Sequence, residues 1–195
     1  GLVGSEMCIR DSYAPHCYSL PALAPGSHHI KIRIDNSPSS VPAEIQSSHA
    51  WTDGTQTNWN GILGDFYIEA TPHTYLKQVQ VYPSVKEKKA RIHVNIYSDS
   101  EQSGVVALSA KTWNTQQEHR LPDMEEQVGL SKGENKIELV LDMGNRMQTW
   151  SEFHPTLYAL NVTLATNEGK DNIITDFGMR DFATEGTQFL SLIHI

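Results

Sequence analysis

Strict alternation of apolar and polar residues is the main pattern along this chain. Residues 28–35 place three isoleucines on one side and charged residues on the other, and residues 91–97 repeat the pattern with Ile92, Val94 and Ile96. Successive side chains of a strand point to opposite faces, so this period of two predicts strands that are half buried. Further strands are predicted from the apolar positions of residues 65–70, 79–81, 105–108, 136–141, 157–165 and 173–177.

The helical period is weak throughout the chain. Residues 123–130 are the best helix candidate, and Gly129 interrupts them. Many short strands separated by turn residues are typical of a β-sandwich. Between residues 73 and 184 roughly seven strand-like runs fall within ~110 residues, which is the size of one Ig-like sandwich. The sequence therefore predicts an all-β fold.

The natural domain boundary is Thr71-Pro72, because proline cannot donate a backbone N–H to a sheet ladder. Residues 13–71 hold too few strands to close a sandwich, since an isolated strand pair leaves unpaired edges and little core. We therefore expect residues 13–71 to be the C-terminal part of a larger domain. Residues 72–189 are expected to form the Ig-like sandwich.

The two ends of the chain depart from this pattern. Residues 1–12 have no hydrophobic period and lack the basic start and long apolar centre of a signal peptide. They resemble translated sequencing-adapter DNA, and residues 190–195 resemble the same kind of artefact. We expect both tails to be non-native. Without them Cys17 is the one remaining cysteine, so no internal disulfide is expected and the redox compartment stays open.

Charge and composition limit the classes of partner that this chain is expected to bind. The net charge is -8, and the one basic cluster is residues 86–91, so no nucleic-acid partner is expected. No apolar run approaches the ~20 residues of a membrane span. The nine histidines show no ligand spacing. His28 and His29 point to opposite faces of a predicted strand, and His93 and His119 are expected at the surface. Neither a metal nor another cofactor is therefore expected.

A long polar loop, residues 47–61, contains two tryptophans. Long loops in β domains are usually functional or disordered, and two tryptophans argue against disorder. Tryptophan rings can stack on the apolar faces of sugars, while Asn, Asp and His bind hydroxyl groups. Both tryptophans could instead be buried in the core of the sandwich. The core position is favoured for Trp59, which lies beside Gly61-Ile62, and the two interpretations are equal for Trp51. The candidate substrate-binding residues are His49, Trp51, Asp53, Asn58 and Trp59.

Four motifs in order resemble the non-catalytic domains of family 2 glycoside hydrolases, the β-galactosidase, β-glucuronidase and β-mannosidase group. Residues 59–68 resemble the signature that closes the sugar-binding jelly roll, and residues 20–36 resemble the Leu, Pro-Gly and Ile-Arg-Val-Asp-Asn segment before it. Residues 150–158 resemble the Trp, Pro, Leu-Tyr motif of the Ig-like domain, and residues 177–180 its Phe-Gly-x-Arg ending. Leu63-Gly64 replaces an Arg or Tyr-Arg common in the family, which leaves the particular activity open.

The resemblance implies a partial jelly-roll (galactose-binding-like) sandwich followed by an Ig-like β-sandwich, both from a retaining enzyme that hydrolyses O-glycosyl bonds. In the family, two Glu residues on a (β/α)₈ barrel perform the reaction. This chain has no barrel pattern, so no catalytic residue is assigned and the fragment alone is expected to be inactive. The expected partners are carbohydrate and the missing barrel of the same chain.

Some individual residues also carry expectations. Asn167-Glu168 mimics the acid/base pair of the family but lies in a predicted turn. Arg180 is expected either to pair with a carboxylate at the domain junction or to lie at the surface. Four aromatic residues of the second domain are expected in the core: Trp113, Trp150, Tyr158 and Phe177.

Two other functions remain open. The chain could be a stand-alone carbohydrate-binding β-sandwich module, or a purely structural Ig-like interaction protein. The motif order favours the glycosidase, and the Trp- and Asn-rich loop favours sugar binding over the structural alternative. The resemblance makes export to the periplasm or outside the cell an expectation. The segment that would show a signal peptide is expected to lie outside this chain. The sequence does not specify the sugar, its linkage or the oligomeric state.

Overall fold

The computed structural model describes an all-β chain, with no helix among the residues that it describes. The chain divides into two compact units, Gly1–Ile68 and Glu69–Ile195. Every described strand belongs to the second unit. The described residues are 18, 20, 23–35, 37, 42–44, 62, 65–68, 70–185 and 188–192.

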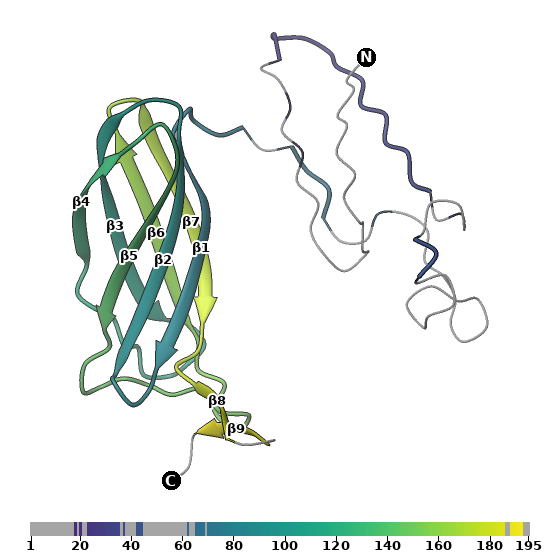
Figure 1. Ribbon diagram of the computed structural model, residues 1–195. Helices are drawn as coiled ribbons and strands as arrows, with labels where there is room; N and C mark the ends of the chain where they lie inside the picture. The colour runs from purple at the N-terminus through teal and green to yellow at the C-terminus, as the bar shows by residue number, and fades with distance from the viewer. Residues whose placement is uncertain are drawn as a thin grey trace. The chain divides into compact units, whose positions relative to one another are not determined.

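Seven strands of the second unit form a sandwich of two antiparallel sheets (Figure 1). One sheet has the order β1-β2-β5 and the other β4-β3-β6-β7, so the chain changes sheet after β2, β4 and β5. This is the two-layer architecture of an Ig-like domain. The strands are β1 (Tyr75–Ser84), β2 (Lys89–Ser98), β3 (Gln102–Thr112), β4 (Met124–Leu130), β5 (Gly133–Asp142), β6 (Tyr158–Thr166) and β7 (Gly169–Phe177).

The core lies between the two sheets and follows from the alternation. In β2, Ile92, Val94 and Ile96 are at most 1% exposed, whereas the residues between them face outward. In β6, Leu160 and Val162 are likewise buried. Burying one such side chain contributes ~1.5–3 kcal/mol, so these facing rows hold the two sheets together.

The sequence predicts the strands of the second unit well. Each strand predicted between residues 73 and 184 overlaps an observed one. The helix candidate at residues 123–130 is wrong, because this segment is β4, paired with β3. Val128 and Leu130 alternate toward the core, and the ladder with β4 pairs backbone groups along the edge of β3 that a helix here would leave unpaired.

The strands predicted in the first unit are not observed. The described residues of 28–35 and 65–70 form no strand, and no ladder joins them to another described segment. Ile30, Ile32 and Ile34 are 49%, 51% and 50% exposed. Alternation indicates only which face would be buried. A strand also needs a partner for its backbone groups and a second layer over its apolar face.

The large aromatic side chains divide between core and surface. Tyr158 and Phe177 are buried, as predicted, and stack with ring centroids 5.3 Å apart. Trp150 is only partly buried. The prediction is wrong for Trp113, which is 56% exposed. Trp113 follows the end of β3, where its backbone N–H donates to the carbonyl of Leu157, so its ring lies outside the paired layers.

Trp150 packs against the Phe-Gly-x-Arg segment. Its backbone N–H donates to the Met179 carbonyl at 3.0 Å, and the guanidinium carbon of Arg180 lies 4.6 Å from its ring centroid. A Cβ atom at Gly178 would lie 2.8 Å from the Trp150 Cβ and 2.9 Å from its Cγ, which is too close for carbon atoms. Glycine therefore makes room for the indole, and the cation of Arg180 covers its face.

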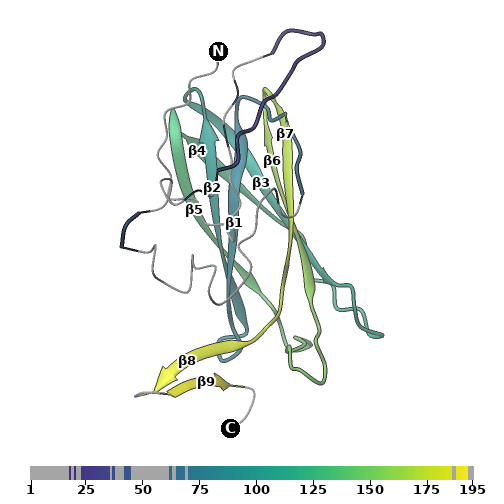
Figure 2. The ribbon, with the colours of Figure 1, turned by 90° about the vertical axis from the view of Figure 1, so that its right-hand side faces the viewer.

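A second antiparallel pair, β8 (Asp181–Glu185) and β9 (Gln188–Leu192), follows the sandwich. Figure 2 shows the chain running from the end of β7 directly into β8. The Asp181 carboxylate accepts hydrogen bonds from the backbone N–H groups of Val85 (2.7 Å) and Lys86 (3.3 Å). These two contacts attach the start of β8 to the turn between β1 and β2.

Replacing Gly178 by alanine is expected to lower the free energy of unfolding by about 1–3 kcal/mol, because the added methyl overpacks the site against Trp150. Urea denaturation followed by tryptophan fluorescence measures the change. Gly129→Ala in β4 is the matched control, since a Cβ there meets nothing within 4 Å. Equal stability of the two variants would contradict the packing argument.

Candidate functional site

The sequence-predicted sugar-binding residues cannot be placed in the fold. They lie outside the described part of the chain, and the positions concerned are His49, Trp51, Asp53, Asn58 and Trp59. The functional chemistry of the described residues must therefore be sought in the second unit. There, polar side chains gather at both ends of the sandwich.

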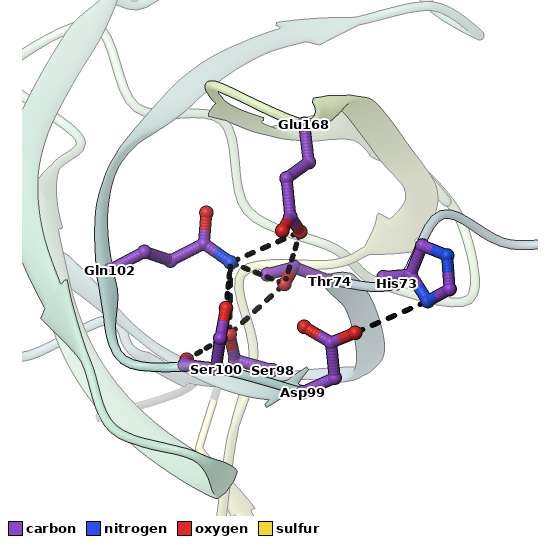
Figure 3. A network of polar contacts seen from close by, with 7 residues as sticks. All are labelled: His73, Thr74, Ser98, Asp99, Ser100, Gln102 and Glu168. Atoms are coloured by element: carbon purple, nitrogen blue, oxygen red, sulfur yellow. Dashed lines mark hydrogen bonds and ion pairs between the residues drawn. The ribbon is translucent and has the colours of Figure 1, made fainter.

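The first group joins strand ends from both sheets (Figure 3). Thr74 precedes β1, Ser98 ends β2 and Gln102 begins β3. Glu168 comes from the turn between β6 and β7. Thr74 and Ser98 are only 2% and 0% exposed, so their hydroxyl groups require partners inside the protein. We call these four residues the strand-end network.

Short hydrogen bonds hold the strand-end network together. Gln102 Nε2 donates to Thr74 Oγ1 at 2.7 Å and lies 3.2 Å from Glu168 Oε2. The Thr74 hydroxyl also donates to the same carboxylate oxygen at 3.2 Å, and it lies 3.0 Å from Ser98 Oγ. The amide nitrogen must face the carboxylate, because the amide oxygen would repel it. This orientation leaves the buried Gln102 Oε1 without a protein partner.

The neighbouring histidine, aspartate and serines do not form a nucleophilic triad. His73 Nδ1 lies 3.2 Å from Asp99 Oδ2, and the His73 side chain is 82% exposed. In Figure 3, Asp99 lies between the imidazole and the two serines, Ser98 and Ser100. The Ser98 hydroxyl instead donates to the Ser100 carbonyl at 2.8 Å. A nucleophile needs its base within hydrogen-bond reach, so this group is structural.

Glu168 lies in the predicted turn, and its carboxylate binds Thr74 and Gln102. Sequence reasoning identified the turn but not these partners. One signal for the network was present, because Ser98 continues the inward row of Ile92, Val94 and Ile96. A polar residue at the end of a buried row indicates a buried hydrogen bond.

The second polar group lies at the other end of the sandwich, around the hydroxyl of Tyr158. This oxygen accepts a hydrogen bond from the backbone N–H of Gln148 at 2.9 Å, and it lies 2.7 Å from His119 Nδ1. His119 is 6% exposed, so its predicted surface position is wrong. The loop after β3 folds back, and the Thr112 N–H donates to the His119 carbonyl at 3.0 Å, which brings the imidazole inside.

Burial sets the protonation of this pair. Desolvation lowers the pKa of His119 below its usual 6.5, and the positive charge of Arg146 lowers it further. Burial raises the pKa of the Tyr158 hydroxyl, against the opposing effect of the Gln148 hydrogen bond. Both groups are therefore neutral at pH 7. The hydroxyl can then donate to the imidazole while it accepts from Gln148, which satisfies all three groups.

A polar hollow opens beside His119, lined also by Arg146, Gln148 and His154. Its amide, imidazole and guanidinium groups suit hydrogen bonding. The buried Tyr158 hydroxyl next to His119 is already engaged by two partners, so this tyrosine is not poised as a nucleophile. In the described part of the chain, no three His, Cys, Asp or Glu side chains are grouped to hold a metal ion. No membrane-spanning helix occurs there either.

The buried neutral imidazole predicts a pH-dependent stability. The unfolded His119 takes up a proton below about 6.5, whereas the folded one does so only at lower pH. The free energy of unfolding should therefore fall as the pH drops from 6.5 through the lowered pKa. His119→Gln is expected to flatten this part of the profile in urea titrations from pH 8 to 4. A slope that survives in His119→Gln would refute the assignment.

Comparison with known proteins identifies the sandwich. The sequence profile of glycosyl hydrolases family 2 matches residues 74–180, more than half of the chain. The match begins at Thr74 of the strand-end network and ends at Arg180, which covers Trp150. No curated protein matches the chain.

Solved structures are similar at low sequence identity. A family 2 glycosyl hydrolase from Bacteroides cellulosilyticus DSM 14838 is 19% identical over 60% of this chain and 17% of its own length, with a TM-score of 0.46. The Parabacteroides merdae β-glucuronidase is 16% identical over 62% and 15%, with a TM-score of 0.47. A family 2 β-galacturonidase from Eisenbergiella tayi is 18% identical over 61% and 21%, with a TM-score of 0.44. The matched region thus spans about a fifth or less of each solved chain. On the profile match, which covers the sandwich from Thr74 to Arg180, this chain belongs to glycosyl hydrolases family 2.

Proposed function

We propose that this chain supplies non-catalytic domains of a retaining glycoside hydrolase that cleaves O-glycosyl bonds, with the catalytic barrel outside residues 1–195. The observation that carries the proposal is the family match over residues 74–180, which coincides with the Ig-like sandwich. Membership of the family supports carbohydrate as the substrate class. Hydrolysis itself would require a pair of carboxylates that this chain is not proposed to supply.

The contacts of the sandwich support a role in holding neighbouring domains. The strand-end network fixes the start of β1 against the other sheet, and the Tyr158 group fixes the loops at the opposite end. Asp181 attaches the outgoing strand β8 to the turn between β1 and β2. Each end of the sandwich is therefore a rigid point of attachment.

The domain assignment forms part of the proposal. Residues 13–71 would be the C-terminal part of a galactose-binding-like jelly roll, and residues 72–189 the Ig-like domain. Residues 1–12 and 190–195 would be non-native tails. The partner of both domains would be the catalytic barrel of the same polypeptide.

The loop of residues 47–61 is proposed to line a sugar subsite of the complete enzyme. Its support is the side-chain chemistry of the candidate residues. Two indole rings supply platforms for pyranose faces, and imidazole, carboxylate and amide groups supply hydrogen bonds to hydroxyls. The loop would act on binding and orientation, and the barrel would perform the chemistry.

The purified 195-residue chain is expected to hydrolyse no p-nitrophenyl β-galactoside, β-glucuronide or β-mannoside above background. Sequencing the source DNA outward from codons 13–189 should show a frame that continues into a barrel with two Glu residues at strand ends. Hydrolysis by the chain itself would overturn the proposal. Authentic start and stop codons around the chain, together with sugar binding, would instead favour the stand-alone carbohydrate-binding module.

In the complete enzyme, Trp51→Ala and Asn58→Ala are each expected to lower kcat/KM by about tenfold or more, the equivalent of ~1.4 kcal/mol of lost transition-state binding. Steady-state kinetics with the natural-sugar glycoside measure the effect. Trp113→Ala, which removes an exposed indole of the sandwich, is the control and should leave kcat/KM unchanged. Unchanged kinetics in both loop variants would contradict the proposal that this loop lines a sugar subsite.

A further inference from the structure

The outward face of the three-stranded sheet carries a continuous set of aromatic and amide side chains. Along β2 the buried apolar residues alternate with outward-facing Arg91, His93, Asn95 and Tyr97. Their partners on the neighbouring strand β1 are Tyr82, Gln80, Gln78 and Tyr75. We call these eight residues the Tyr-amide face.

Two aromatic pairs lie at the two ends of the Tyr-amide face. Tyr75 and Tyr97 have ring centroids 5.5 Å apart, and Tyr82 and His93 have centroids 4.6 Å apart. His93 and Tyr97 are separated by four residue steps along β2, which corresponds to about 13 Å at ~3.3 Å per residue. Tyr82 is 48% exposed, so its ring is accessible from solvent. The face therefore offers two platforms at a fixed spacing.

Amide groups fill the space between the platforms. Asn95 Nδ2 donates to Gln78 Oε1 at 3.1 Å across the two strands, and Gln80 follows on the same face of β1. Each amide has two donor hydrogens and an acceptor oxygen, so one shared bond leaves further hydrogen-bonding capacity. These groups suit a ligand that presents both donors and acceptors.

The charges around the face select against a charged ligand. Arg91 lies 3.2 Å from Glu87, and His93 lies 3.2 Å from Glu138. Lys77 forms an ion pair with Glu134. Since Arg91 and Lys77 each have a carboxylate partner, the face presents no concentrated field of either sign. The chemistry that remains, ring faces and amides, is complementary to a neutral polyhydroxylated chain.

We propose that the Tyr-amide face binds a linear neutral oligosaccharide that lies along the strands. One sugar ring would stack on Tyr82 and another on the Tyr75–Tyr97 pair, with about one ring between them hydrogen-bonded to Gln78 and Asn95. This site is separate from the loop of residues 47–61 in sequence. The inference rests on the proposed function for its ligand class, because carbohydrate is the substrate class of the family.

Affinity electrophoresis of the full chain in native gels tests the proposal. The gels contain soluble β-1,4-glucan, xylan, glucomannan or galactan as the probe. At least one polysaccharide should retard the wild-type chain, and Tyr82→Ala or Tyr97→Ala should each weaken its apparent affinity roughly fivefold. Phe153→Ala, which removes an aromatic ring that is 82% exposed elsewhere on the sandwich, is the matched control and should bind as the wild type does.

Three further measurements separate the outcomes. Tyr82→Phe should restore binding, because it keeps the ring face, and circular dichroism with thermal unfolding should show that each variant is folded. Trp51→Ala should leave the retardation by the Tyr-amide face in place. The proposal fails if no probe retards the chain, or if folded Tyr82→Ala and Tyr97→Ala variants bind as the wild type does; loss of binding in Trp51→Ala would then assign the binding to the loop. Such a failure would leave the glycosidase assignment standing, since hydrolysis assays and the DNA sequence test that separately.

Discussion

The structure depends on the apolar contact between two small sheets. One sheet has three strands and the other four, so neither could bury its inner face alone. The rows from Ile92 to Ile96 in β2 and from Leu160 to Leu164 in β6 are almost fully withdrawn from water. This contact also determines what happens at the strand ends. Where a strand leaves the apolar layer, its polar groups must form hydrogen bonds with side chains.

The two polar groups are the consequence of that requirement. At one end, Glu168 accepts hydrogen bonds from Thr74, just before β1, and from Gln102, at the start of β3, and these two strands belong to different sheets. At the other end, the Tyr158 hydroxyl joins an imidazole and a backbone N–H. Both groups contain titratable residues, yet their geometry explains closure of the sandwich and not catalysis.

The sequence predicts what depends on local alternation and misses what depends on distant partners. Ile92, Val94 and Ile96 were identifiable because their period of two directly encodes a buried face. The helix candidate at 123–130 shows the limit, since the run of Glu and Gln in β4 hides an edge strand that only β3 reveals. Burial of His119 was not readable either, because its partner, Tyr158, lies 39 positions further along the chain.

The alternation of Ile30, Ile32 and Ile34 shows that a period of two does not by itself predict burial. The same pattern that is buried in β2 is half exposed there, because burial requires a covering layer as well as a period. The candidate sugar-binding loop lies beyond the described residues, so for that site the sequence remains the only source. Side-chain chemistry alone suggests its ligand class, and backbone geometry would be needed to fix its orientation.

The parallel course of β1 and β7 has a mechanical consequence. The chain enters the sandwich at Thr74, at the start of β1, and leaves it at Asp181, beside the turn that ends β1. The two positions are therefore separated by the ten residues of β1, or about 30 Å at the usual rise of a strand. The sandwich is therefore a spacer whose reach from Thr74 to Asp181 is about one strand length. Changing the number of residues in β1 would change that reach, whereas substitutions on its outer surface would not.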